Sequence, residues 1–441
     1  MQHRPLLSVM ASAFLAGEQR IAQVVTRGGK VLGKVRRWLA PLADRYLKFI
    51  DGRTRPRHRD VVQFLSKDAD FRRVLRSRSH KPVIADWMTD PQIMQPVVAA
   101  KNWDLPSIES TAELAHWLQV TSGELEWFAD LKKLTHATRT DAKLRHYHYR
   151  LLTKKSGNIR LIEAPKPRLK EIQQRILHSI LEKIPPHPAA HGFLKGRSIQ
   201  TFASSHVGQR VVIRMDLQDF FPTISSDRIQ TAFRTMGYPE AVANRLGGIC
   251  TNATPLDVWK AHEADPLLIQ AARELHKRRH LPQGAPTSPA LANLCAYRLD
   301  CRLAGLAKAV NAQYTRYADD LVFSGNEAFE RVAGRFSIHV AAILMEEGFH
   351  VNHRKTRIMR QGVRQHLVGL VANQKVNVIR SDFDRLKAIL NNCVHLGPQS
   401  QNREAHPNFR MHLEGRVRFV AQINPQKGQR LRMLFDKIQW T

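Results

Sequence analysis

The chain has 441 residues, which is long enough for two or three domains, and its 43% content of hydrophobic residues excludes global disorder. Its 69 Lys and Arg residues outnumber 38 Asp and Glu residues, a net charge of +31. Such an excess predicts a polyanionic partner, with nucleic acid as the first candidate and an anionic membrane surface as the second. No stretch approaches the roughly 20 apolar residues needed to span a bilayer.

Residues 1–98 are predicted to form a basic, mostly helical N-terminal extension. Its start, residues 6–16, is superficially similar to a short signal sequence, but the basic character continues far beyond it, which favours an amphipathic helix. Four arginines at alternate positions, 53 to 59, follow in a polar run. This extension is either a solvated helical face with a linker or a surface that contacts RNA.

The four cysteines are scattered and form no Cys-x-x-Cys pair (Cys250, Cys295, Cys301 and Cys393). This pattern argues against a disulfide framework and a zinc ribbon, and it favours a reducing, cytoplasmic location. No His-Glu-x-x-His spacing occurs, so a structural zinc site is not expected.

Two capping-box patterns, at residues 110–113 and 121–124, predict short helices around 114–118 and 125–131. The pair is similar in layout to a helix-turn-helix DNA reader. Acidic residues on the second helix would repel phosphate, so structural packing is the favoured role.

Further along the chain, periodicity predicts alternating strands and helices. The expected elements are two strands within 146–165 joined by a turn at 156–158, a helix over 168–184, a strand over 211–215, helices within 226–279 and over 299–310, a strand–turn–strand around Asp319, a helix over 332–347, a strand pair within 367–378, and helices over 382–396 and 415–423. A strongly basic tail closes the chain.

The segment Tyr317-Ala-Asp-Asp320 places two adjacent carboxylates between apolar, β-prone residues. Acids in such a setting are costly unless a cation neutralises them, as divalent metals do at a nucleotidyl-transfer site. Taken alone, the tetrapeptide fits an ordinary acidic hairpin tip equally well. The rest of the chain decides between the two.

A third carboxylate, Asp216, closes the apolar strand 211–215. A hairpin tip beside this strand end would let Asp216 and Asp319 bridge two Mg²⁺ ions, with Mn²⁺ as the alternative, while Asp320 supports the site. Leu217, the next residue, is included among the metal-binding positions. Asp219 is the nearby alternative ligand, but it begins the departing turn and is expected to cap or bond locally.

Five segments now resemble, in order, the motifs of the reverse transcriptases, over roughly residues 105–435. They are Asp216-x-x-x-Phe-Phe221, Leu281-Pro-Gln-Gly-Ala-Pro-Thr-Ser-Pro289, Tyr317-Ala-Asp-Asp320, Gly348-Phe-His-Val-Asn-x-x-Lys355-Thr and Leu367-Val-Gly-Leu-Val-Ala-Asn373. The resemblance implies an RNA-directed DNA polymerase with an α+β, right-hand fold. Its expected parts are fingers (99–207), a palm with an antiparallel sheet (208–378, with a helical part at 226–279) and a helical thumb (379–441).

The same resemblance implies roles for further residues. Phe221 would be the steric gate against ribonucleotides, although a core phenylalanine is the alternative. Since Phe220 and Phe221 are adjacent, one of them could serve the core and the other the gate. Gln283 and Gly284 would contact template and incoming nucleotide in a loop where the backbone approaches closely, although a plain turn is the alternative. The positions expected to hold the triphosphate are Lys154 (or its neighbour Lys155), Arg160 and Lys355, the last as a possible general acid toward pyrophosphate.

Two segments, Ala189–Ser198 and Glu414–Pro425, look like those of bacterial retron and group II intron relatives. Retron enzymes typically have Asn-Ala-x-x-His and Val-Thr-Gly, where this chain has Phe202-Ala-Ser-Ser-His206 and Leu367-Val-Gly369. The residues expected to contact RNA are Arg197, His206, Gly369, Arg416 and Arg418.

A retron type implies a cognate structured RNA copied into DNA from dNTPs, priming from a guanosine 2′-hydroxyl, a separate effector protein and a role in phage defence. The alternatives are another bacterial reverse transcriptase with different priming, whether group II-like, abortive-infection or CRISPR-associated, and a non-catalytic RNA-binding scaffold that kept a polymerase fold.

Overall fold

The computed structural model describes residues 3–52, 54–77, 82–87, 89–132, 134, 142–154, 158–261 and 265–440. The chain divides into two compact units, one made of residues 1–185 and 221–295 and the other of 186–220 and 296–441. Each unit therefore combines segments that are far apart in the sequence. No helix within the described ranges is long and apolar enough to cross a membrane.

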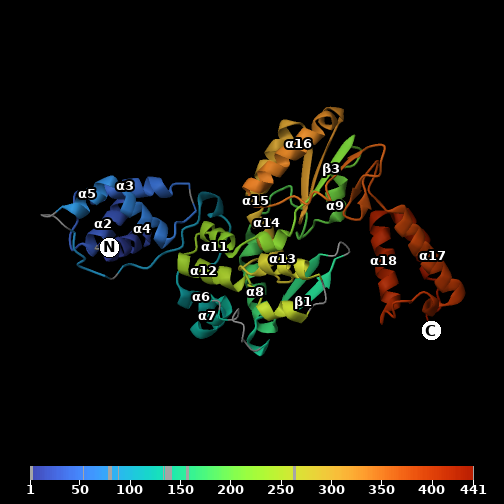
Figure 1. The fold of residues 1–441 in the computed structure, drawn as a ribbon, viewed down its shortest axis with the longest axis horizontal. Coiled ribbons are helices and arrows are strands. Elements are labelled where there is room, and N and C mark those ends of the chain that lie inside the picture. Colours follow the sequence, from blue (N-terminus) through green and yellow to red (C-terminus); the bar gives the residue numbers. More distant parts are fainter. Residues whose placement is uncertain are drawn as a thin grey trace. The chain divides into compact units, whose positions relative to one another are not determined.

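Residues 3–77 of the first unit form a cluster of helices with its own apolar core (Figure 1, blue). The helices are α1 (Arg4–Leu15), α2 (Ile21–Val31), α3 (Leu39–Ile50), α4 (His58–Lys67) and α5 (Ala69–Arg76). Phe14 and Tyr46 pack in this core with ring centroids 5.1 Å apart. Asp68 caps α5 by accepting a hydrogen bond from the backbone N–H of Phe71.

The arginine run that begins at residue 53 is not a uniformly solvated face. Arg55 is only 7% exposed, and its guanidinium donates to the backbone carbonyls of Leu15 and Gly237. Burial lowers the pKa of Arg55 to about 10. This arginine therefore fastens the N-terminal helices to the segment after α11, and it is not available to solvent.

The remainder of the first unit is helical around one β-hairpin. Its elements are η1 (Val98–Ala100), α6 (Thr111–Leu118), α7 (Ser122–Ala129), η3 (Ala142–Leu144), β1 (Tyr147–Thr153), β2 (Ile159–Pro165), α8 (Pro167–Ser179), η4 (Leu181–Lys183), α11 (Ser226–Thr235), α12 (Glu240–Ile249), η5 (Leu256–Ala261), α13 (Pro266–His276) and α14 (Ser288–Cys295). Both predicted N-caps are confirmed, because Ser110 and Thr121 accept bonds from the backbone of Glu113 and Glu124. The predicted hairpin is also confirmed, since β1 and β2 pair antiparallel.

The second unit is built on a four-stranded antiparallel sheet in the order β4-β5-β3-β6. Its strands are β3 (Val211–Asp216), β4 (Gln313–Tyr317), β5 (Asp320–Gly325) and β6 (Arg357–Arg360), and the helices α9 (Ile199–Ser204), α15 (Tyr297–Ala309) and α16 (Glu327–Glu346) accompany them. The short helix α10 (Phe220–Thr223) starts at the last residue of the segment 186–220 and continues into the first unit. Figure 1 shows α16 running beside β3. Phe323 of β5 packs between Tyr314 and Phe336, at 4.8 and 5.0 Å between ring centroids. This aromatic layer joins α16 to the sheet.

The C-terminal part of the second unit is mostly helical. It contains a small sheet of β7 (His366–Leu367), β8 (Leu370–Val371) and β9 (Asn377–Val378), followed by α17 (Arg380–Leu396), η6 (Pro398–Ser400), α18 (Phe409–Ile423) and α19 (Pro425–Phe435). Three short strands replace the expected pair. The last helix, α19, was not predicted; it buries Leu431 and Phe435 among basic neighbours.

Candidate active site

The acidic pair and Asp216 meet at one end of the sheet. Strands β3 and β5 pair antiparallel with Asp216 opposite Asp320, and Tyr317 of β4 lies opposite Asp320. Ala318 and Asp319 therefore form a two-residue turn, and Ala318 adopts a left-handed conformation with φ of 54°. The backbone N–H of Leu217 donates to the Asp319 carbonyl over 2.8 Å. The strand end and the hairpin tip lie together, as predicted.

Two of the three carboxylates are neutralised by cations of the chain itself. Asp216 is 3% exposed, and Lys355 Nζ lies 2.9 Å from its Oδ2. Asp320 is 9% exposed, and Arg214 Nε lies 2.7 Å from its Oδ1. The sequence reasoning missed Arg214, although its position two residues before Asp216 places both on one face of the strand.

Asp319 forms no ion pair with any residue in the described ranges. Burial, followed by the neighbouring charges of Asp320 and Asp216, raises its pKa to about 6. A bound cation would relieve this repulsion, so Asp319 is a candidate cation ligand. Perturbed titration of this kind marks candidate functional sites.

The donor set fits a magnesium ion in its chemistry. Carboxylate oxygens of Asp216 and Asp319 are hard ligands of the kind that Mg²⁺ prefers. Among the described residues, no three His, Cys, Asp or Glu side chains are arranged to hold a metal ion together. Asp320 faces Arg214 and Asp216 faces Lys355. Asp216 and Asp319 therefore remain the candidate metal ligands, with Asp320 as a candidate supporting residue.

Two adjacent aromatic residues follow Asp216, and they differ in burial. Phe220 is buried, 4% exposed, and packs 5.6 Å from Phe349 between ring centroids. Phe221 is half-buried. Phe220 is thus the core residue of the pair, and Phe221 remains the candidate gate. Asp219 lies in the departing turn, with φ of 48°.

Within the first unit, the Gln-Gly loop is fixed to β2. The Gln283 carbonyl accepts from the backbone N–H of Glu163 over 2.9 Å. Gly284 has φ of 134°, and a Cβ there would lie 2.8 Å from the Glu163 carbonyl oxygen. Only glycine fits this position, because both the backbone conformation and the space exclude a side chain.

A buried network beneath this loop was not predicted from the sequence. The Glu163 carboxylate lies 2.8 Å from His280 Nε2 and accepts from Asn252 and Thr254. Burial alone would raise the pKa of Glu163, but His280 outweighs it and holds that pKa below its usual range. The pair shows no motif in the sequence, since its members are 117 residues apart.

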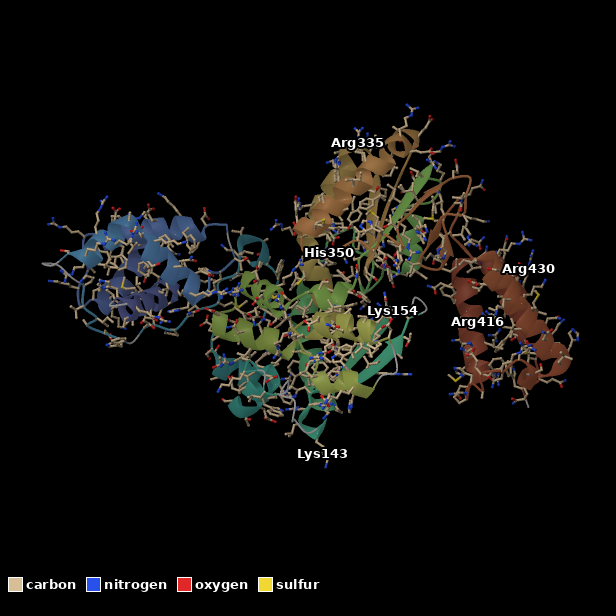
Figure 2. All side chains as sticks on the ribbon, in the orientation of Figure 1. Lys143, Lys154, Arg335, His350, Arg416 and Arg430 are labelled. Carbon is tan, nitrogen blue, oxygen red and sulfur yellow. The ribbon has the colours of Figure 1, made fainter. Side chains whose placement is uncertain are left out.

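The candidate triphosphate residues of the first unit lie on the hairpin. Arg160 is exposed on β2, opposite Leu152 of β1. Lys154 follows β1, and its backbone N–H donates to the Asn158 carbonyl over 2.7 Å; Figure 2 labels its side chain at this end of the hairpin. Lys155 and the first two residues of the predicted turn, 156 and 157, lie outside the described residues.

The structure corrects the expected RNA contact of His206. This side chain is 0% exposed, and its two ring nitrogens lie 2.7 Å from Ser324 Oγ and 2.6 Å from Thr315 Oγ1. Burial lowers the pKa of His206 to about 3, so the imidazole is neutral. His206 links α9 to strands β4 and β5, and it has no surface to offer an RNA.

The other candidate RNA residues lie at the surface of the second unit. Arg197 is exposed and donates to the Pro188 carbonyl over 2.6 Å. Gly369 has φ of 83° in the turn between β7 and β8. Arg416, labelled on α18 in Figure 2, is half-buried, and burial followed by the nearby charge of Arg385 lowers its pKa. Arg418 is exposed, with Nη2 2.7 Å from Glu414.

Comparison with known proteins shows which family the chain belongs to. The family model described as reverse transcriptase (RNA-dependent DNA polymerase) matches residues 152–380. The retron Mx65 reverse transcriptase of Myxococcus xanthus is 39% identical over 339 residues, covering 75% of this chain and 72% of the relative. The chain therefore belongs to the reverse transcriptase family.

Two further relatives narrow the assignment. The retron Mx162 reverse transcriptase of Myxococcus xanthus is 34% identical, covering 74% of this chain and 66% of the relative. The retron Ec86 reverse transcriptase of Escherichia coli is 29% identical, covering 66% of this chain and 82% of the relative. Within its family, the chain is an RNA-directed DNA polymerase of the retron type.

Proposed function

We propose that this chain copies part of a cognate structured RNA into DNA by nucleotidyl transfer at Asp216 and Asp319. The observation that supports this most is the pairing of β3 with β5, which sets Asp216 opposite Asp320 and ties Leu217 to the turn at Asp319. Backbone pairing thus brings three carboxylates from two distant segments to one end of the sheet.

Asp216 and Asp319, with the backbone of Leu217, would hold two Mg²⁺ ions, or Mn²⁺ in their place. When bound, such ions clamp the attacking and leaving oxygens of an in-line displacement. Asp320, held by Arg214 at 2.7 Å, orients the turn and adds negative charge near the ions. The chain thus supplies both the ligands and a fixed frame for them.

Lys355 acts first as the counter-charge of Asp216, at 2.9 Å. Its side chain is 57% exposed, so the ammonium can swing from Asp216 to the phosphates of a bound dNTP. From there it can donate a proton to the departing pyrophosphate.

For residues of the first unit, the proposed roles rest on the resemblance to the reverse transcriptases and on the chemistry of each side chain. The hairpin of β1 and β2 would be part of the fingers, with Arg160 and Lys154 neutralising the triphosphate. Gln283 and Gly284 would contact the template and the incoming nucleotide, and the Phe221 ring would exclude a ribose 2′-hydroxyl. In this right-hand assignment the four-stranded sheet belongs to the palm, and α17 to α19 form the thumb.

The net charge and the retron relatives support nucleic acid as the partner. A structured RNA and its cDNA suit the excess of 31 positive charges, because A-form RNA is held mainly by its shape and backbone. We propose priming from a guanosine 2′-hydroxyl, a separate effector protein, a role in phage defence and a cytoplasmic location.

The test combines purification with sequencing. The protein, isolated from its host, should carry a small RNA covalently joined to DNA that is complementary to part of it. In the Asp319→Asn/Asp320→Asn variant the DNA should be absent while RNA binding persists. Incorporation by that variant would contradict the polymerase site, and RNA without any DNA on the parent protein would favour a non-catalytic scaffold.

A further inference from the structure

A fully buried ion pair lies directly beneath the acidic turn. Arg316, on β4, and Asp300, on α15, are both 0% exposed. Arg316 donates from Nε to Asp300 Oδ1 over 2.8 Å and from Nη2 to Oδ2 over 2.7 Å. Tyr314 Oη also donates to Asp300 Oδ1, over 2.8 Å. This two-pronged geometry fixes the plane of the guanidinium.

The third nitrogen of Arg316 reaches the turn itself. Nη1 donates to the backbone carbonyl of Ala318 over 3.1 Å. Ala318 has φ of 54°, a left-handed conformation that a residue with a Cβ adopts only at a cost. Ala318 is bonded directly to Asp319, so a hydrogen bond that holds this carbonyl also sets the direction of the Asp319 backbone.

The same guanidinium reaches the segment that follows Asp216. Its central carbon lies 5.9 Å from the centroid of the Phe220 ring, within range of a cation–π contact. Arg316 therefore touches both the turn that carries Asp319 and the core residue that anchors the chain after Asp216.

The outer side of the turn is held by the segment at 189–192. The backbone N–H of Arg316 donates to the Ala189 carbonyl over 2.8 Å, and the Arg316 carbonyl accepts from the N–H of His191 over 2.7 Å. A Cβ on Gly192 would lie 2.6 Å from the backbone nitrogen of Ala318. The backbones approach this closely only because residue 192 is glycine.

Stability alone does not account for a buried ion pair at this place. Taking two charges out of water is costly, and well-packed apolar residues often serve a core equally well or better. An apolar pair would lack the donor that holds the Ala318 carbonyl. What Arg316 adds beyond packing is therefore a hydrogen-bond donor directed at the Ala318 carbonyl.

We propose that Arg316 and Asp300 are a positioning pair for the reaction: they fix the Ala318 carbonyl and so hold the Asp319 carboxylate in its metal-binding position. This deepens the proposed function and rests on it. Neither residue touches the reacting atoms. Each acts through the turn.

The test compares two variants and a matched control in the full-length protein. Arg316→Lys keeps the charge but loses the fork and the bond to Ala318. Asp300→Leu/Arg316→Met removes both charges together and leaves no unpaired ion. The control is Arg302→Lys, because Arg302 lies on the same helix as Asp300 but pairs with Glu347, over 2.8 Å between Nη1 and Oε1, and with Glu346.

Melting temperature, steady-state dNTP incorporation and Mn²⁺ binding are measured for each protein, the last by the loss of the free-Mn²⁺ resonance. Both variants at Arg316 should lose about 100-fold in kcat, as expected when a reacting group is misplaced by about 1 Å. Their KM for dNTP should change little, and the dissociation constant for Mn²⁺ should rise about tenfold. The control should resemble the parent in kcat and Mn²⁺ affinity.

Two results would overturn the proposal. One is an Asp300→Leu/Arg316→Met protein that melts like the parent and also keeps the parent kcat, because the pair would then be packing only. The other is Arg316→Lys, the milder change, with unaltered kcat and Mn²⁺ affinity. Activity in Asp319→Asn would instead contradict the proposed function itself, so the two failures are distinguishable.

Discussion

Arg214 and Asp320 form an ion pair across strands β3 and β5, with 2.7 Å between Nε and Oδ1 and side chains only 22% and 12% exposed. Arg214 pairs in register with Val322, two residues from Asp320, so both side chains lie on one face of the sheet. The pair commits Asp320 to a cation of the chain. Asp216 is likewise paired, with Lys355 at 2.9 Å, so Asp319 is the one carboxylate of the three that has no ion pair within the described residues.

Replacing Arg214 tests the strength of this commitment. Arg214→Met leaves the Asp320 charge largely buried without its partner, so the free energy of unfolding should fall by about 3 kcal/mol. Chemical denaturation measures this change. The control is Arg360→Met on β6. The Arg360 side chain is 70% exposed, and its partner Glu330 also pairs with Arg210, so this variant should unfold at nearly the parent denaturant concentration. Equal losses of stability in the two variants would contradict the assignment of Arg214 as the buried partner of Asp320.

The raised pKa of Asp319 predicts how stability depends on pH in the metal-free protein. Its folded pKa is about 6, against an ordinary 3.8, so the folded state holds the proton more tightly than the unfolded state. Stability should therefore be greatest below about pH 4 for this group and should fall as pH rises to 6, by at most about 3 kcal/mol.

Asp319→Asn should lack this component. The free energy of unfolding is measured in EDTA between pH 4 and 8. The stability of Asp319→Asn relative to the parent should increase as pH rises. Identical pH profiles for the parent and the variant would mean that Asp319 titrates normally.

His206 is expected to matter for folding and not for RNA binding. In His206→Leu the hydroxyls of Ser324 and Thr315 lose their buried partner, so the free energy of unfolding should drop by about 2–3 kcal/mol. The RNA dissociation constant at a temperature well below melting should stay unchanged. A selective loss of RNA affinity in a stable His206→Leu protein would reinstate a direct contact.

Arg416 and Arg418 give a matched comparison for RNA binding by α18. Arg416 lies beside another cation, Arg385, whereas Glu414 offsets the charge of Arg418. Arg416→Ala should therefore weaken RNA binding several-fold and lower the slope of log affinity against log salt by about 1. Arg418→Ala should do less on both counts, and the reverse order would argue against α18 as the contact surface in this form.

The site acids were predictable because their signal is local. Asp216 ends an apolar strand, and Asp319 and Asp320 lie between two others, so the alternation of residues alone places them at strand ends. The helix caps at Ser110 and Thr121 were predictable for the same reason. Each of these features depends on residues within a few positions of one another.

Features that depend on packing between distant segments could not be predicted. Asp300 and Arg316 meet only because α15 packs on β4, and neither residue belongs to a motif. His206 lies in a polar-looking segment that gives no sign of its burial. The last helix, α19, was not predicted because arginines flank Leu431 in the sequence and hide its apolar pattern. Leu431 is 0% exposed in the structure.

The most direct measurement of the central claim is dNTP incorporation by Asp319→Asn beside Asp219→Asn, on the RNA that the protein carries. Asparagine tolerates the left-handed turn at residue 219, where φ is 48°, so Asp219→Asn should keep activity within about threefold of the parent. Asp319→Asn should lose at least about 1,000-fold, since a metal-binding carboxylate is removed. Comparable activity in the two variants, with RNA binding intact in both, would contradict the assignment of Asp319 to the catalytic site.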